Sequence, residues 1–225
     1  MIMPRNYLNW RLSNKKLLMK NFLLTSIATA LIFCGNLQGQ TPTAQRKAPV
    51  APQSAQTEGS GAQKYFSDVE LLNQNGAKLR FYSDLIKGRT VVIIPFFTTC
   101  TSVCPPMNRN MEKVQEALGD RLGKQVFLIS ISVDPVTDTP ERLKAYAEKF
   151  HAKPGWSFIT GKKENVDWAL YKLGQYVEEK NSHGSIMIIG NEATGLWKKA
   201  YALSKADELI RLIEGVAADK GSGSQ

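Results

Sequence analysis

Two continuous apolar segments constrain the fold of this chain more than any other feature. They are TVVIIPFF (90–97) and QVFLISISVD (125–134), which consist almost entirely of β-branched and other apolar residues up to a polar end. Strands that are covered on both faces of a sheet are apolar throughout, whereas strands with one solvated face alternate. Between the two segments Met107, Met111 and Leu118 recur at helical spacing. The pattern therefore predicts two buried strands connected by a helix.

The remaining segments extend this alternation. Residues 65–81 alternate around Asn75-Gly76, a dipeptide that is typical of a tight hairpin turn. Further along the chain we expect a helix that begins at Thr139-Pro140-Glu141, a helix over 164–173, and strands over 185–190 and 196–201, followed by a last helix. Strands that alternate with helices imply a mainly parallel sheet, and the closing hairpin adds an antiparallel edge. The predicted fold class is α/β, a thioredoxin-like fold with an added N-terminal β-hairpin.

The basic residues of the chain are concentrated near its start. Residues 1–64 hold eight Lys and Arg against Glu58 alone, whereas the remainder holds 21 basic and 19 acidic residues. The formal net charge of +9 therefore belongs mainly to the N-terminal segment. It does not indicate a folded nucleic-acid-binding face.

An uncharged apolar run, residues 22–34, follows a cluster of three lysines. Its length suits the ~7 to 15-residue core of a secretory signal better than a membrane span of ~20 residues. The small residues that signal peptidase prefers are poorly matched near Gly39, so retention as a membrane anchor is the alternative. The expected organisation is a signal peptide or N-terminal membrane anchor (1–40), a flexible linker (41–64), a folded domain (65–218) and a disordered tail (219–225). We expect a monomer in the periplasm or anchored to the outer face of the cytoplasmic membrane.

Two of the three cysteines follow the first buried strand, in FFTTCTSVCPPM. Cys34 lies in the leader, so the exported part retains Cys100 and Cys104 alone. A disulfide between them would close too small a loop to add much stability, which favours a functional pair over a structural one. The two prolines that follow indicate the first turn of a helix, and a helix N-terminus favours a thiolate.

Thiolates four residues apart can bind one metal ion together, but the site needs a further ligand. Of the two histidines, His151 lies at the end of a predicted helix, where a solvated imidazole is unremarkable. His183 precedes a strand, and in a thioredoxin-like sheet this loop lies beside the cysteine turn. Two cysteines and a histidine suit Cu(I), Cu(II) or Zn(II), and the exported location favours copper. The alternative for His183 is a hydrogen bond with its own backbone.

Three motifs surround these residues: F-x-x-C-x-x-x-C-P, ISVDP with DTPERLKAYAEKF, and a lone histidine before an apolar strand. Together they resemble the Sco/SenC family of copper-binding proteins, which serve cytochrome c oxidase assembly, over residues 65–215. The resemblance implies that Cys100, Cys104 and His183 bind one copper ion. The domain would then deliver copper to the dinuclear copper site of cytochrome c oxidase subunit II, or keep the cysteines of that client reduced. Thr101-Ser102 replaces the Pro-Asp that is usual in the family.

Asp134 and Asp138, in SVDPVTD, are candidates for tuning the metal site or docking a partner. Their alternative is turn and helix-start chemistry, which Asp before Pro commonly serves. Met107 and Met111 carry soft sulfur donors, but a methionine pair at this spacing is typical of core packing.

An exported thiol-disulfide oxidoreductase or thiol peroxidase on the same fold is the alternative function. Redox thioredoxins have two residues between their cysteines and a proline beside the disulfide, whereas this chain has three and no proline in residues 178–190. A peroxidase needs an arginine beside the reactive cysteine, and Arg109 is the only basic residue close in sequence. A bare adaptor domain would leave Cys100, Cys104 and His183 unexplained.

Overall fold

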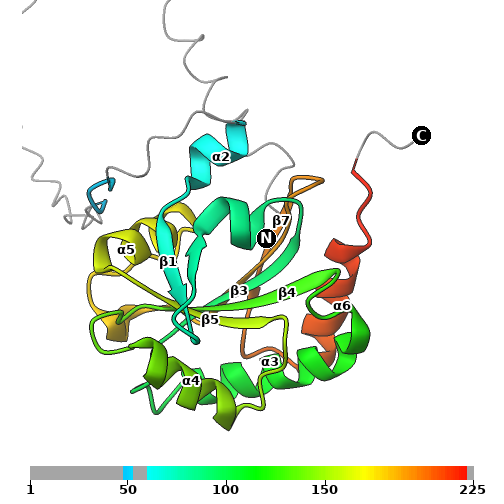
Figure 1. Ribbon diagram of the computed structural model, residues 1–225. Coiled ribbons are helices and arrows are strands. Elements are labelled where there is room, and N and C mark those ends of the chain that lie inside the picture. Colours follow the sequence, from blue (N-terminus) through cyan, green and yellow to red (C-terminus); the bar gives the residue numbers. More distant parts are fainter. Residues whose placement is uncertain (1–47, 53–59, 222–225) are drawn as a thin grey trace, which may run out of the picture. The chain divides into compact units, whose positions relative to one another are not determined.

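A computed structural model describes residues 48–52 and 60–221, in which seven strands form one sheet with helices on both faces (Figure 1). The strand order is β2-β1-β5-β4-β3-β6-β7. The strands are β1 (Glu70–Asn73), β2 (Lys78–Arg80), β3 (Thr90–Phe96), β4 (Val126–Ser132), β5 (Trp156–Thr160), β6 (Ile186–Asn191) and β7 (Leu196–Tyr201). The helices are α2 (Gly61–Phe66), α3 (Cys104–Leu118), α4 (Pro140–Lys149), α5 (Lys163–Lys172) and α6 (Ala206–Ala217), and a π-helical segment (Phe81–Ile86) follows β2. The α/β class with an N-terminal hairpin is confirmed.

The sheet is mixed, which corrects our expectation of a mainly parallel one. Strands β3, β4 and β5 are parallel, but β6 is antiparallel to β3 and β1 is antiparallel to β5. The directions of β1 and β6 depend on the loops that lead into and out of them. Apolar composition encodes burial and not direction, so the sequence pattern could not show these reversals.

The two faces of the sheet carry separate parts of the core. Val92, Ile94 and Phe96 of β3 pack with residues of α3, α4 and α6, whereas Val91 and Ile93 pack with α5 and the π-helical segment. Every residue of β3 is buried. Burial on both faces of the sheet therefore explains why the sequence of β3 is apolar throughout, as predicted.

Pro95 lies where the sheet opens at the carboxyl end of β3. The β3–β6 pairing ends at Ile93 and Ile188, although β3 remains paired with β4 as far as Phe96. The carbonyl oxygen of Phe96 accepts a hydrogen bond from the backbone N–H of Val133 at 2.8 Å, so the backbone polar groups of Phe96 point toward β4. Because these groups alternate in direction along a strand, those of Pro95 point toward β6, and proline has no N–H to donate there. The sheet ladder therefore does not join β3 to β6 at this end.

The predicted turn at Asn75-Gly76 is confirmed, and Gly76 has the positive φ of 74° that such a turn requires. The hairpin is shorter than expected, because Tyr65 and Phe66 belong to helix α2. Ser60 begins that helix: its side chain accepts a backbone N–H of the first turn at 3.2 Å. Alternation of polar and apolar residues did not distinguish one helical turn from the start of a strand.

The predicted leader, residues 1–40 with the apolar run 22–34, lies outside the described residues, as do 53–59 and 222–225. Among the helices of the described part, none has the length and apolar character that crossing a bilayer requires.

Candidate metal centre

Three segments bring sulfur and nitrogen donors together at one end of the sheet. Cys100 and Cys104 follow the carboxyl end of β3, and His183 precedes the start of β6. Because β6 is antiparallel to β3, the end of one strand and the start of the other lie at the same edge. One donor atom from each of the three residues, two Sγ atoms and a ring nitrogen, lies within 4.8 Å of the others. The structure thus brings together the three side chains that the sequence singled out.

The cysteine pair occupies the beginning of α3, as the two prolines predicted. Cys104 is the first residue of the helix and is fully buried. Its backbone N–H donates to the sulfur of Cys100 at 3.4 Å. An N–H at a helix start has no partner within the helix, so this contact uses a free donor to stabilise negative charge on sulfur.

The two thiols differ in acidity. Burial raises the pKa of Cys100, but the hydrogen bonds that its sulfur accepts from Cys104 and Ser102 outweigh burial and place its pKa below the ordinary value. Burial and the nearby Cys100 sulfur raise the pKa of Cys104 far above its usual range. Cys100 therefore loses its proton more readily than Cys104, and a metal that binds both sulfurs must displace the proton of Cys104.

His183 presents one ring nitrogen to the cysteines and the other to its own backbone. Its Nε2 atom lies 3.5 Å from Sγ of Cys104, and its Nδ1 atom lies 3.4 Å from the carbonyl oxygen of Gly184. Burial lowers the pKa of His183, which keeps the ring neutral. The backbone contact that we considered as an alternative is therefore present, but it engages Nδ1. A neutral ring protonated on Nδ1 leaves the lone pair of Nε2 directed at the sulfur, an arrangement common to histidine ligands.

Asp138 is not part of the donor group but holds the segment before Cys100 in place. Its buried carboxylate accepts hydrogen bonds from the backbone N–H of Thr98 at 3.1 Å, from the Thr98 hydroxyl, and from the Ser132 hydroxyl at 2.6 Å. These contacts join the loop after β3 to the end of β4. Asp138 thus positions the cysteine loop.

Asp134 lies on the same β4–α4 loop but contacts the histidine side of the site. Its carboxylate pairs with Nζ of Lys180 at 2.6 Å. Burial raises the pKa of Asp134, but the hydrogen bonds and charge of Lys180 and the hydrogen bonds from Thr137 together outweigh burial and lower the pKa overall. The same Nζ lies 5.3 Å from the ring centre of Phe97, whose ring meets that of His183 edge-to-face.

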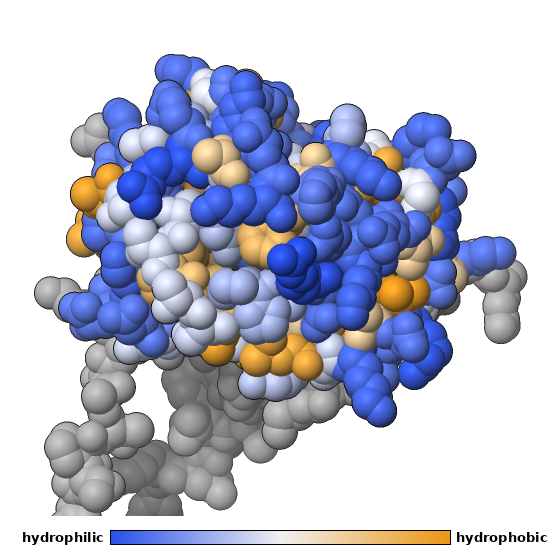
Figure 2. Space-filling model, turned by 90° about the horizontal axis from the view of Figure 1, so that it is seen from below, coloured by the Kyte–Doolittle hydropathy of each residue, from blue (hydrophilic) through white to orange (hydrophobic). Residues whose placement is uncertain are grey.

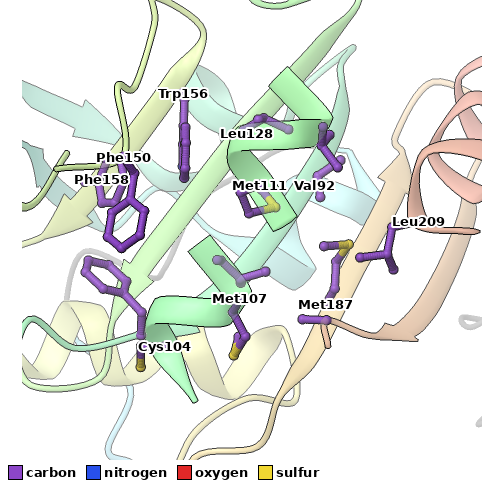
Figure 3. Packing of buried hydrophobic residues seen from close by; sticks show 14 of the residues in the cluster. Val92, Cys104, Met107, Met111, Leu128, Phe150, Trp156, Phe158, Met187 and Leu209 are labelled. Carbon is purple, nitrogen blue, oxygen red and sulfur yellow. The ribbon is translucent and has the colours of Figure 1, made fainter. Parts of the chain in front are cut away.

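The other candidates are structural. His151 is exposed, and its Nδ1 lies 2.6 Å from a carboxylate oxygen of Glu112. Met107 and Met111 are fully buried in the same core cluster as Cys104, which confirms their packing role (Figure 3).

Sequence reasoning missed the residues that hold the site together, chiefly Thr98, Ser132 and Lys180. Thr98 stands two positions before Cys100, and proximity to the motif could have indicated it. The contact between Lys180 and Asp134 joins residues 46 positions apart, so no local pattern could have indicated it.

The profile of the family described as SCO1/SenC matches residues 57–216, which is most of the chain and includes the whole sheet and all but the last residue of helix α6. The chain belongs to the SCO1/SenC family. A SCO2-like protein of Rickettsia felis is 34% identical over 163 residues, which cover 68% of this chain and 77% of that protein. A protein of Stutzerimonas stutzeri whose name refers to copper binding is 31% identical over 106 residues, 47% of this chain and half the length of that relative.

Solved structures agree with this assignment. A SCO1/SenC family lipoprotein from Bacillus anthracis is 30% identical, with a TM-score of 0.56, and the match covers 66% of this chain and 92% of that one. BsSco, described as a member of the Sco family of cytochrome c oxidase assembly proteins and as having a disulfide switch, is 26% identical with a TM-score of 0.55, over 67% of this chain and 92% of that one. The prediction of a thioredoxin-like fold is confirmed.

Proposed function

We propose that this SCO1/SenC protein binds one copper ion through Cys100, Cys104 and His183. It then delivers the copper to the dinuclear copper site of cytochrome c oxidase subunit II, or keeps the cysteines of that site reduced. The observation that carries the proposal is the convergence of two thiol sulfurs and one neutral imidazole within 4.8 Å. Family membership supports it, as do the copper-binding name of one relative and the oxidase-assembly role of BsSco.

The number of donors argues against a structural zinc site. Structural zinc sites almost always have four protein ligands in a closed tetrahedron. Within residues 60–221, no further His, Cys, Asp or Glu joins the group of three. Soft thiolates with one imidazole suit copper in either oxidation state.

Copper analysis of the reduced protein tests the proposal. We expect one copper per chain, and His183→Ala should weaken binding at least about tenfold, because losing even a second-shell partner of a metal ligand costs that much. The matched control is His151→Ala, since this second histidine is exposed and paired with Glu112. Titration against a competing copper chelator measures both variants. Equal affinity of the His183 variant and the wild type would remove the third ligand from the proposal.

A thiol-disulfide oxidoreductase is the second candidate, and the asymmetry of the cysteine pair favours it. A lowered pKa at Cys100 beside a raised pKa at Cys104 is the arrangement of an attacking thiolate with a resolving thiol. The two roles are linked, because copper binding requires the dithiol.

Oxidation of the pair should abolish copper binding. Cys100 and Cys104 carry sulfurs within 4.8 Å of each other, and residues four apart at a helix start fall within the ~4.4 to 6.8 Å Cα separation that a disulfide tolerates. We expect oxidised protein to resist alkylation and to take up no copper until a reductant is added. Equal copper uptake by the oxidised and reduced forms would contradict thiolate ligation.

One face of the domain supports our proposal of a monomer that meets its client transiently. The face that carries α3 and α4 is mostly hydrophilic, with small separate hydrophobic areas (Figure 2). Large apolar patches mark stable interfaces, and this face shows none.

We propose that residues 22–34 hold part of the population at the outer face of the cytoplasmic membrane. The predicted linker of residues 41–64 connects anchor and domain, except that its last four residues belong to helix α2. A tether of this kind raises the effective concentration of a chaperone near a membrane-bound client.

Fractionation of the native cells tests the tether. We expect part of the protein in the membrane fraction with residues 22–34 retained, detected by mass spectrometry of the N-terminal peptide. Protein found wholly in the soluble fraction, with an N-terminus near Thr41, would show that the leader is a cleaved signal.

A further inference from the structure

The donor group is almost closed to solvent. Cys100 and His183 are each 8% exposed, and Cys104 is completely buried. Copper must nevertheless enter and leave. Cys104 lies in helix α3 and cannot move without it, whereas His183 lies in the connection between α5 and β6, residues 173–185, whose regular structure is one 3-10 turn (Lys180–Ser182). The histidine side is therefore the side of the site that can open.

The sheet does little to hold His183 against the cysteines. The β3–β6 pairing has ended at Ile188, and Pro95 offers no N–H on that side. The chain is tied to β7 at residue 185, where the carbonyl oxygen of Ser185 accepts the N–H of Ala202 at 2.7 Å. His183 thus lies just beyond the last fixed point, with Gly184 between.

An ion pair supplies the missing connection across the site. Nζ of Lys180 bonds Asp134 at 2.6 Å and lies near the ring of Phe97, which packs on the ring of His183. Asp134 belongs to a rigid loop, because its carbonyl oxygen accepts the N–H of Asp138 at 2.9 Å and its own N–H donates to Ser132 at 3.0 Å. The β4–α4 loop therefore holds the cysteine segment with one carboxylate and the histidine segment with the other.

We propose that Lys180 is a positioning residue for copper: its ion pair with Asp134 is a latch that keeps Nε2 of His183 beside Cys104. Closing the latch gives copper its imidazole ligand, and opening it leaves two sulfurs and an exposed path for transfer. This inference rests on the proposed function, because it concerns the same metal centre.

The experiment measures copper loss from the full-length protein to a competing chelator, together with the nitrogen hyperfine signal of the Cu(II) form. Lys180→Gln and Asp134→Asn should each increase the rate of copper loss about fivefold, the size expected for a favourable, partly exposed ion pair, and weaken the nitrogen signal. Lys180→Arg should keep both the rate of copper loss and the nitrogen signal at the wild-type level, since guanidinium also pairs with a carboxylate. The control is Lys163→Gln, which breaks a pair of equal length with Asp167 on α5 and should change neither.

A double-mutant cycle separates positioning from general stability. In a His183→Ala background Lys180→Gln should have no further effect, because the ligand that the latch positions is gone. An unchanged rate and nitrogen signal in Lys180→Gln, or an equal effect with and without His183, would overturn the latch alone. Failure of the reduced wild-type protein to bind copper would overturn the proposed function and the latch with it.

Discussion

Replacing either Cys100 or Cys104 with alanine should abolish copper binding at concentrations that saturate the wild type. Each variant loses a thiolate, which supplies both a soft donor and the negative charge that offsets the metal cation. We expect the affinity to fall by more than about 100-fold, since a lost ligand must exceed the ~10 to 100-fold cost of a lost second-shell partner. The measurement is competition between the reduced protein and a chelator of known affinity.

A buried sulfur that is not a ligand provides the control. Met107 lies one turn after Cys104 and is fully buried, and leucine has a similar volume. Met107→Leu should therefore retain one copper per chain with unchanged affinity. Wild-type affinity in Cys104→Ala, or copper loss in Met107→Leu equal to that of the cysteine variants, would contradict the proposed ligand set.

Asp138→Ala should destabilise the fold and loosen the copper site together. The substitution leaves the buried Ser132 hydroxyl and the half-buried donors of Thr98 without their acceptor, which costs about 3 kcal/mol of unfolding free energy. It also frees the segment that carries Cys100, so copper affinity should fall by about 10 to 100-fold. Chemical denaturation measures the first effect and chelator competition the second.

Two further variants make this prediction specific. Asp138→Asn keeps the shape of the side chain but turns an amide group toward hydroxyl and N–H donors, so it should show a smaller loss of the same kind. Asp120→Ala, at an exposed position after α3, should change neither stability nor affinity. Normal copper affinity in a folded Asp138→Ala protein would show that the carboxylate serves the fold alone.

The sequence predicted what depends on local chemistry. The apolar composition of β3 predicted burial on both faces of the sheet. Pro105-Pro106 predicted the start of a helix, and helix α3 begins at Cys104. The direction of β6 could not be predicted from the sequence, because it depends on the path of residues 173–185. The role of Lys180 could not be predicted either, since its partner Asp134 becomes its neighbour only when the sheet has formed.

The pairing of β3 with β6 also determines the order in which the metal centre is assembled. Thr90 pairs with Asn191, so this contact closes a far longer loop than the connection from β3 to β4 or the β6–β7 hairpin. Long loops carry a larger closure entropy, and non-local contacts form slowly. We therefore expect Cys100 and Cys104 to be in place after β3 before the pairing of β6 brings the imidazole to them. Until that pairing forms, the two thiols lack the third donor of the site, and we expect them to be most prone to disulfide formation in this interval.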